Sequence, residues 1–239
     1  METKMRLNKF LAHAGICSRR DADRLIEQGK VYVNGKLPTV GQNVTEADEI
    51  IVDGKVVRGQ SKKVVLAFYK PVGVTCTERD AHARRVISDL VKYPERVTYA
   101  GRLDKDSEGL LLLTNDGDLI QAMMRGANGH EKEYIVKVNK EITPEFITKM
   151  GQGIYLRELD MKTKECVVEM LGRYTFRIIL TQGLNRQIRR MCSALGYQVK
   201  SLKRIRVMHV LLDNLKPGEY RELNKADVEI LQRDCGLIK

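Results

Sequence analysis

The sequence predicts an α+β protein of two domains: a small N-terminal domain of two helices and a small sheet, and a larger domain with a mainly antiparallel, mixed sheet and flanking helices. Three observations predict this class. Residues 5–52 contain two helical patterns followed by short strands, residues 53–63 form a polar linker, and residues 64–239 alternate between strands and helices. The sequence has no glycine-rich strand-to-helix turn, which favours an antiparallel sheet over a doubly wound parallel one.

The N-terminal domain begins with two short helices. Apolar residues spaced i, i+3, i+4 and i+7 predict the first one: Leu7, Phe10, Leu11 and Ala14. Ser18 followed by Asp21 is a capping-box pattern that opens the second helix, and Gly29 ends it. Arg20 and Arg24 lie one turn apart on another side of this helix, where they could contact phosphates together.

Short strands complete the N-terminal domain. Residues 31–33 (Val-Tyr-Val) and 49–52 predict strands, and Asn34-Gly35 predicts a tight hairpin turn. Residues 53–63, which contain glycine and lysine and lack periodicity, are interpreted as the linker.

The larger domain is predicted from alternating apolar patterns and turn signals. Strands are predicted at 64–69, 96–100, 110–114, 133–138, 165–169 and 175–180. Helices are predicted at 118–124, 144–150 and 186–195. In the last helix, Ile188, Met191, Cys192 and Leu195 form the apolar side and Arg186, Arg189 and Arg190 the basic side.

Composition excludes several classes of protein. The 239 residues are 43% hydrophobic and 31% charged, a balance that fits neither a disordered chain nor a membrane protein. Apolar runs stop far short of the about 20 residues that a membrane span requires. The first residues lack the apolar core of a secretory signal, so a cytoplasmic protein without membrane contact is expected.

The sequence offers no pattern for a metal or a nucleotide cofactor. The cysteines contain no C-x-x-C pair, and the histidines are dispersed. The residues concerned are Cys17, Cys76, Cys166, Cys192 and Cys235, and His13, His82, His130 and His209. Neither a G-x-G-x-x-G nor a G-x-x-x-x-G-K-[ST] motif is present, so neither a metal nor a cofactor is expected.

Positive charge suggests an anionic partner. The chain has 42 Lys and Arg against 31 Asp and Glu, a formal net charge of +11. Residues 170–212 contain nine basic residues and no carboxylate. A solvated basic face is the simpler explanation for a short run, but over this length a polyanion contact is favoured, and RNA is the expected partner.

The N-terminal motifs resemble an S4 domain, a small RNA-binding module. The resemblance rests on residues 6–11 (Arg-Leu-Asn-Lys-Phe-Leu), 15–20 (Gly-Ile-Cys-Ser-Arg-Arg) and 29–36 (Gly-Lys-Val-Tyr-Val-Asn-Gly-Lys), and covers 5–52. It implies that the two helices present basic side chains to structured RNA. The RNA-contacting residues expected from it are Lys9, Arg19, Arg20, Arg24 and Lys30.

Residues 101–110 (Gly-Arg-Leu-Asp-Lys-Asp-Ser-Glu-Gly-Leu) form the densest polar segment between predicted strands. On pattern alone this is a solvent turn in which Asp104, Asp106 and Ser107 bond to nearby backbone. The segment resembles the signature loop of the pseudouridine synthases, in the branch with an N-terminal S4 domain, the small-subunit synthase A family. Residues 70–73, 131–134 and 183–191 match further motifs, and the last two are most similar to members that act on 23S rRNA.

The resemblance implies an activity without a cofactor: a uridine in RNA is isomerised to pseudouridine by moving the ribose bond from N1 to C5 of uracil. Asp104 matches the nucleophile, and an aspartate is ionised at neutral pH without help from a base. The resemblance leaves open whether Asp104 attacks uracil C6 or ribose C1′. The nucleotide must be flipped out of its stem or loop, and Arg102 matches the side chain that fills the vacated space.

Further site residues follow from the same motifs. Tyr134 reads as a packed tyrosine from its alternating strand, but by resemblance it is the ring that stacks on the flipped uracil. Arg189 is expected to form the salt bridge with Asp104. Substrate binding or positioning is expected of Arg102, Lys132, Arg186, Arg190 and Lys70.

The function expected is therefore pseudouridine formation in a 23S rRNA stem-loop by a monomer. The same activity on 16S rRNA or tRNA is an alternative. A non-catalytic S4-type ribosome-binding factor is another, although it would not need Asp104, Tyr134 and Arg189 in motif order. An S4-containing RNA methyltransferase should show a glycine-rich cofactor loop, which the sequence lacks.

Overall fold

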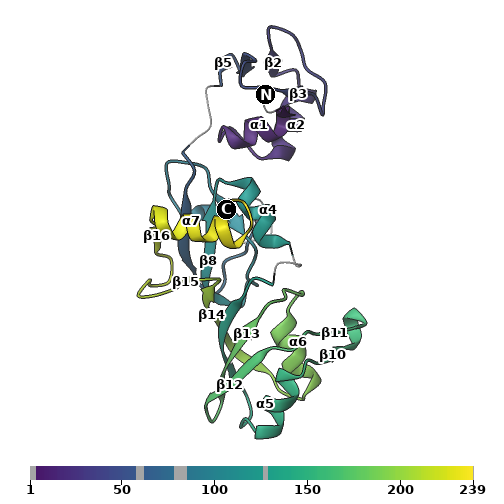
Figure 1. The fold of residues 1–239 in the computed structure, drawn as a ribbon, viewed down its shortest axis with the longest axis vertical. Helices are drawn as coiled ribbons and strands as arrows, with labels where there is room; N and C mark the ends of the chain where they lie inside the picture. Colours follow the sequence, from purple (N-terminus) through teal and green to yellow (C-terminus); the bar gives the residue numbers. More distant parts are fainter. Residues whose placement is uncertain (1–3, 58–61, 78–84, 126–128, 239) are drawn as a thin grey trace. The chain divides into compact units, whose positions relative to one another are not determined.

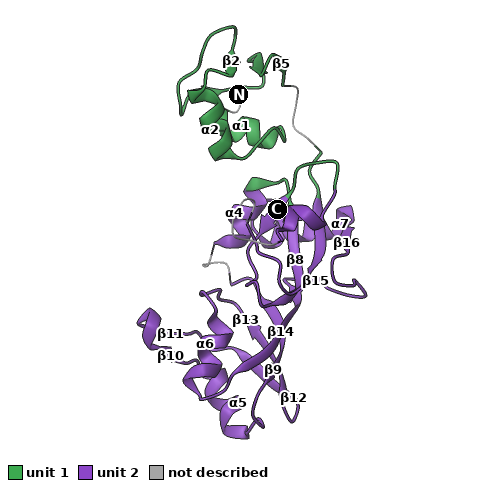
Figure 2. Ribbon diagram, turned by 180° about the vertical axis from the view of Figure 1, so that it is seen from behind, with its two compact units in different colours: residues 1–64, 93–97, 114–117 green, residues 65–92, 98–113, 118–239 purple. Residues whose placement is uncertain are grey.

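The computed structural model describes residues 4–57, 62–77, 85–125 and 129–238. The chain divides into two compact units, one of residues 1–64 with 93–97 and 114–117, and one of the remaining residues (Figure 2). No helix in the described ranges is long and apolar enough to cross a membrane. The predicted α+β class is confirmed, with an S4-type N-terminal part and a mixed sheet.

The N-terminal part contains the two predicted helices, α1 (Leu7–His13) and α2 (Arg19–Glu27). Ser18 caps α2, because its Oγ accepts a hydrogen bond from the Asp21 backbone N–H at 3.1 Å and donates one to the Asp21 carboxylate at 2.8 Å. Strands β1 (Met5–Arg6) and β3 (Asn43–Val44) pair antiparallel. The prediction that the second helix opens at Ser18 is confirmed by this cap.

A second small sheet follows in the order β2 (Val31–Val33), β4 (Ile50–Val52) and β5 (Lys55–Val56). Asn34 and Gly35 have φ values of 49° and 74°, the left-handed pair of a tight turn. Residues 53–56, predicted as the start of the linker, instead form a second turn and strand β5, while 58–61 lie outside the described residues.

The core of this unit comes from both helices and both small sheets. Its buried side chains are Leu7, Phe10, Leu11, Ala22, Ile26, Val31, Val33, Val44, Ile50 and Val52. The apolar positions that predicted the helices are therefore those that fold against the strands.

A nine-stranded mixed sheet organises the larger unit, in the order β12-β13-β9-β14-β8-β6-β16, with β15 on β14 and β7 on β8 (Figure 1). The strands are β6 (Val65–Lys70), β7 (Thr98–Ala100), β8 (Glu108–Thr114), β9 (Lys132–Val138), β12 (Val167–Gly172), β13 (Thr175–Leu180), β14 (Val199–Val207), β15 (Val210–Leu211) and β16 (Tyr220–Glu222). Neighbours pair antiparallel at β12-β13-β9-β14 and at β6-β16, whereas β14 and β8 run parallel.

Helices cover this sheet at both ends. Helices α4 (Gly117–Met124) and α7 (Lys225–Asp234) place Leu119 and Leu231 in one apolar core with β6 and β8. Helix α5 (Pro144–Gly151) packs Phe146 edge-on against Phe176 of β13, with ring centroids 5.3 Å apart. The remaining elements are α3 (Ile87–Leu90), α6 (Gln187–Ala194), the 3-10 turn η2 (Arg157–Leu159), β10 (Tyr155–Leu156) and β11 (Met161–Lys162).

Gly109 allows the parallel pairing of β8 with β14. Its φ is 106°, and a Cβ built on it would lie 2.2 Å from the Arg204 carbonyl oxygen. Only glycine fits so close an approach between two backbones. The signature loop therefore enters β8 at the point where β14 passes.

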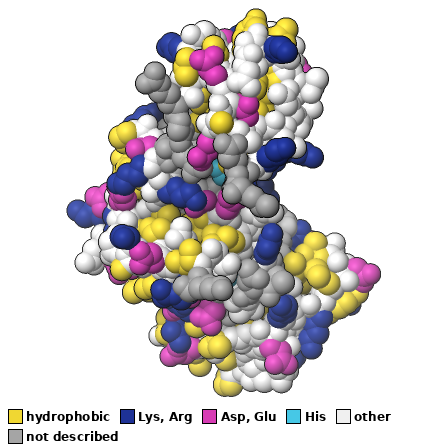
Figure 3. All heavy atoms as spheres, turned by 45° about the horizontal axis from the view of Figure 1, so that its top comes forward, with side chains coloured by type: hydrophobic (Ala, Val, Ile, Leu, Met, Phe, Trp, Pro, Cys, Tyr) yellow, Lys and Arg dark blue, Asp and Glu magenta, His cyan; other side chains and the backbone are white. Residues whose placement is uncertain are grey.

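The basic run 170–212 is not an uncompensated surface. Arg173 pairs with Glu141, Arg177 with Glu133 and Glu169, Arg186 with Asp104 and Asp106, Arg190 with Glu158, and Arg206 with Glu131 and Glu133. Figure 3 shows basic and acidic side chains interspersed on the face drawn. The prediction that all nine charges go unopposed is therefore wrong, because strand pairing and loops bring carboxylates from distant positions beside most of them. Among the described residues, Lys200, Lys203 and Arg204 form no ion pair.

Candidate active site

The signature loop is held by backbone hydrogen bonds and by a buried lysine. The Ser107 N–H donates to the Asp104 carbonyl at 3.1 Å, and the Gly73 N–H donates to the Lys105 carbonyl at 2.7 Å. Lys70, whose side chain is fully buried, donates from Nζ to the Ser107 carbonyl at 2.7 Å and to the Pro71 carbonyl at 2.9 Å. Burial lowers the pKa of Lys70. Lys70 thus anchors the loop to the end of β6.

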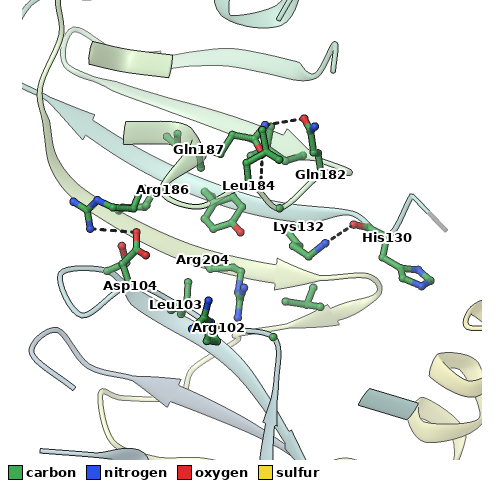
Figure 4. Close-up of a pocket in the computed structure, with 18 of the residues that line it drawn as sticks. Arg102, Leu103, Asp104, His130, Lys132, Gln182, Leu184, Arg186, Gln187 and Arg204 are labelled. Carbon is green, nitrogen blue, oxygen red and sulfur yellow. Dashed lines mark hydrogen bonds and ion pairs between the residues drawn. The ribbon is translucent and has the colours of Figure 1, made fainter. Parts of the chain in front are cut away.

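A pocket of about 150 Å³ opens beside this loop (Figure 4). The pocket is smaller than the about 300–1,000 Å³ of drug-sized ligand sites, so it suits a single base. The residues that line it come from the loop, α4, β9, the end of β13, the start of α6 and β14. Its polar members include Arg102, Asp104, Ser107, His130, Lys132, Tyr134, Gln182, Arg186, Gln187 and Arg204.

Asp104 lies at the pocket with 28% of its side chain exposed. Arg186 approaches it, with Nη1 3.6 Å from Oδ2, and also donates to both oxygens of Asp106 at 3.1 and 3.0 Å. These hydrogen bonds lower the pKa of Asp106. One guanidinium therefore orients both carboxylates of the loop.

The predicted salt bridge between Arg189 and Asp104 is wrong. Arg189 instead donates from Nη2 to the Asp106 carbonyl at 2.8 Å and lies 3.3 Å from the Asp106 carboxylate. The helix α6 begins at Gln187, and Arg186 precedes it with a left-handed φ of 52°, which brings its side chain rather than that of Arg189 to Asp104. Arg190 donates from Nε to the Asn185 carbonyl and pairs with Glu158, away from the pocket lining.

Tyr134 and Lys132 reach the pocket from β9. Tyr134 is 9% exposed and stands opposite Arg204 of β14 in the sheet register. Lys132 donates from Nζ to the His130 carbonyl at 2.9 Å. Its pKa is lowered by burial and by the nearby charge of Arg204. The two predicted side chains thus share the pocket with Asp104, as do Arg102 and Arg186.

Arg204 is a site residue that the sequence analysis missed. Its guanidinium is 3% exposed, lines the pocket and donates from Nε to the Leu110 carbonyl at 2.7 Å. The strand that carries it was not predicted, because its many charged residues read as an RNA-binding run. The alternation of Leu202 and Arg204, which is interrupted by a register shift between Arg204 and Arg206, was the available signal.

The predicted RNA-contacting residues of the N-terminal unit lie mostly on its surface. Arg19, Arg20, Arg24 and Lys30 are exposed, whereas Lys9 is half-buried on α1. Arg24 forms an ion pair with Asp21 at 3.3 Å and Lys30 one with Asp53 at 3.9 Å. Within the described ranges no cluster of His, Cys, Asp and Glu could hold a metal ion.

Comparisons with known proteins identify the family. The family described as RNA pseudouridylate synthase matches residues 64–194, and the S4 domain matches residues 5–50. The dual-specificity RNA pseudouridine synthase RluF of Escherichia coli K12 is 47% identical over 229 residues, which are 95% of this chain and 78% of that protein. The ribosomal large subunit pseudouridine synthase B of Bacillus subtilis is 40% identical over 235 residues, 95% of each protein.

A solved structure shows the same fold. The crystal structure of a pseudouridylate synthase superposes with a TM-score of 0.70 at 30% sequence identity, and the match covers 95% of this chain and 99% of that one. Motifs, fold and relatives converge on one activity. The chain belongs to the RNA pseudouridylate synthase family and is an S4-containing RNA pseudouridine synthase.

Proposed function

We propose that this enzyme isomerises one uridine in a 23S rRNA stem-loop to pseudouridine, with Asp104 as the nucleophile. The observation that carries this proposal is a carboxylate at the edge of a base-sized pocket that also contains Tyr134 and Arg102. An ionised carboxylate attacks without activation, and the same group serves attack at uracil C6 or at ribose C1′.

The other residues have distinct proposed roles. Tyr134 stacks on the flipped uracil, and Arg102 fills the space that the base leaves. Arg186 orients Asp104, while Arg189 and Lys70 fix the backbone of the loop. Lys132 positions the base, and Arg190 contacts an RNA phosphate.

The substrate is proposed from the relatives. The name of the Bacillus subtilis relative specifies the large ribosomal subunit. The 47% identity to RluF, against 40% to that relative, supports our proposal that this chain is a synthase F-like member of the small-subunit synthase A family. RluF is named a dual-specificity enzyme, and on this ground we propose a second RNA substrate for this chain as well, a tRNA loop.

The two parts of the chain have separate proposed tasks. Residues 5–52, together with strand β5, bind RNA, the residues between β5 and residue 64 connect the two parts, and residues 64–239 carry the reaction. The matched families, at 5–50 and 64–194, support this division. We propose that the enzyme works as a monomer in the cytoplasm.

Pseudouridine mapping in cells tests this function. Carbodiimide treatment and primer extension are applied to rRNA and tRNA from cells lacking the protein, and from the same cells complemented with wild type or Asp104→Asn. We expect one 23S stop to disappear in the deletion strain and to return with wild type only. Persistence of every 23S stop would overturn the proposed substrate, and restoration by Asp104→Asn would overturn the proposed nucleophile.

A further inference from the structure

Arg204 is the least compensated charge in the pocket. Its side chain is 3% exposed, and its one hydrogen bond within the described structure is that from Nε to the Leu110 carbonyl. Nη2 is enclosed and has no acceptor. A buried guanidinium that lacks a carboxylate is costly, since desolvation removes its water without supplying a partner.

The other charges in the pocket increase the free-energy cost of burying Arg204. The pocket lining carries Arg102, Lys132, Arg186 and Arg204 but one carboxylate, Asp104, which is paired with Arg186. Among the described residues, neither Arg102 nor Lys132 forms an ion pair. The floor of the pocket thus holds positive charge for which the free enzyme supplies no anion.

A purely structural role would not require an arginine at position 204. The Nε hydrogen bond ties β14 to β8, and one donor suffices for that contact. A guanidinium carries further N–H donors and a permanent positive charge. In the fold, the Nη2 donors of Arg204 have no acceptor. Arg204 is paired on the neighbouring strand with Tyr134, the ring proposed to stack on the base, and both residues line the pocket.

The reaction generates an electron-rich group at this place. When the N1–C1′ bond breaks, its electron pair stays on the uracil ring and is shared between N1 and the two carbonyl oxygens. The ring then forms the C1′–C5 bond, C5 loses its proton and N1 ends protonated, so no co-reactant is consumed. Donors aimed at the carbonyl oxygens stabilise the intermediate charge.

We propose that Arg204 binds a carbonyl oxygen of the flipped uracil through its Nη2 group and stabilises the charge on the ring while the glycosidic bond is broken. Arg102 lines the same pocket as Arg204 (Figure 4). If the acceptor is the C4 oxygen, this donor also favours uracil over cytosine, which carries an amino group at C4. This inference rests on the proposed flipping of uridine into the pocket.

Arg204→Met tests the proposal in single-turnover reactions on an RNA that wild type converts. Removal of one donor to a developing oxyanion lowers the rate constant by about 100-fold. The RNA dissociation constant should stay within about twofold, because phosphate contacts dominate affinity. Arg206→Met is the matched control on the same strand, since Arg206 faces Glu131 and Glu133, and its rate should change by less than about threefold.

Sulfur substitution separates binding of the base from support of the fold. RNAs carrying 2-thiouridine or 4-thiouridine at the target position replace one carbonyl oxygen by a poor acceptor. With the wild-type enzyme, one of the two thiouridine RNAs should react about tenfold more slowly than the uridine RNA. With Arg204→Met, that RNA and the uridine RNA should react at the same rate. Arg204→Lys receives the same measurement and is used alone if Arg204→Met does not fold.

The outcomes distinguish the two proposals. An Arg204→Met rate within about threefold of wild type, or an unchanged thio effect with both analogues, overturns the role of Arg204. Failure of wild type to convert the 23S stem-loop overturns the proposed substrate instead. The variants are then measured on the RNA that mapping shows wild type to modify.

Discussion

At the scale of single residues, Arg186 connects the two carboxylates of the signature loop. Its Nη1 lies 3.6 Å from Asp104, and its two hydrogen bonds to Asp106 are shorter. Arg189 contacts Asp106 and Ser107 in the loop and also donates to the Val199 carbonyl at 3.4 Å. The orientation of the nucleophile therefore depends on the residue just before α6.

Arg186→Met should lower the single-turnover rate constant by about 10- to 100-fold, because Asp104 loses its orienting cation. In an Asp104→Asn background the same change should cost nothing further, since the two residues act as a unit. Arg173→Met, which breaks an exposed ion pair with Glu141, is the control. A larger loss with Arg189→Met than with Arg186→Met would contradict this assignment.

Motif order predicted the residues that line the pocket better than their pairings. The motifs at residues 101–110 and 131–134 predicted four of the lining residues: Arg102, Asp104, Lys132 and Tyr134. The Arg186–Asp104 contact depends on a left-handed backbone conformation at Arg186, which no side-chain spacing reveals.

At the scale of elements, the contact between β8 and β14 fixes the site. Gly109→Ala would place a methyl group 2.2 Å from the Arg204 carbonyl oxygen, at a φ of 106°. We expect a loss of at least about 3 kcal/mol in the free energy of unfolding, measured by urea denaturation. Gly172→Ala has open space and should change it by less than about 0.5 kcal/mol. Equal stability of the two variants would contradict the packing described.

Helix α2 supplies a prediction about RNA affinity. Arg20→Glu with Arg24→Glu should weaken binding and reduce the slope of log K against log salt by up to about 1.8, the loss of two phosphate contacts. Lys216→Glu with Lys225→Glu makes the same change in net charge elsewhere. A filter-binding titration in which both double variants retain the wild-type affinity and slope would refute contact through α2.

Elements with periodic apolar patterns were predicted well, and a charged strand was not. Helices α1, α2, α4, α5 and α6 follow their predicted ranges within a few residues. Strand β14 was missed although it lies in the middle of the sheet. Its Arg206 pairs with Glu131 and Glu133 of another segment, a compensation that only the folded chain displays.

At the scale of the whole molecule, buried thiols give stability a dependence on alkaline pH. Burial raises the pKa of Cys166 and Cys235 to about 11 and that of Cys192 to about 12, from an ordinary 9.0. The unfolded chain loses these protons first, so the folded state binds more protons above pH 9 and stability falls as pH rises. Lys70 and Lys132, whose pKa values are lowered, act in the opposite direction.

Cys192→Val isolates one thiol from these opposing groups. Under reducing conditions between pH 9.5 and 11, the decline of unfolding free energy with pH should be less steep in the variant by up to about 1.4 kcal/mol per pH unit. Urea denaturation across this range measures both slopes. Identical slopes would show that the fold does not hold Cys192 in its protonated form.

The two-domain organisation and the class of activity could be predicted from the sequence, since each depends on local motifs. The ion pairs of the basic residues in 170–212 could not be predicted. A run of nine basic residues without a carboxylate predicted a bare basic surface, yet Arg177 and Arg206 share Glu133 from β9. Net charge along the chain describes local composition, and long-range strand pairing decides which charges meet.

Release of tritium from RNA labelled at C5 of uridine tests the central claim most directly, because C5 loses its hydrogen when it becomes the point of attachment. The purified chain is incubated with the labelled 23S stem-loop in the presence of EDTA. We predict release by wild type without any added metal or cofactor, and a rate lower by at least about 10⁴-fold in Asp104→Asn with unchanged RNA affinity. Release by Asp104→Asn at a rate near that of wild type would contradict the account.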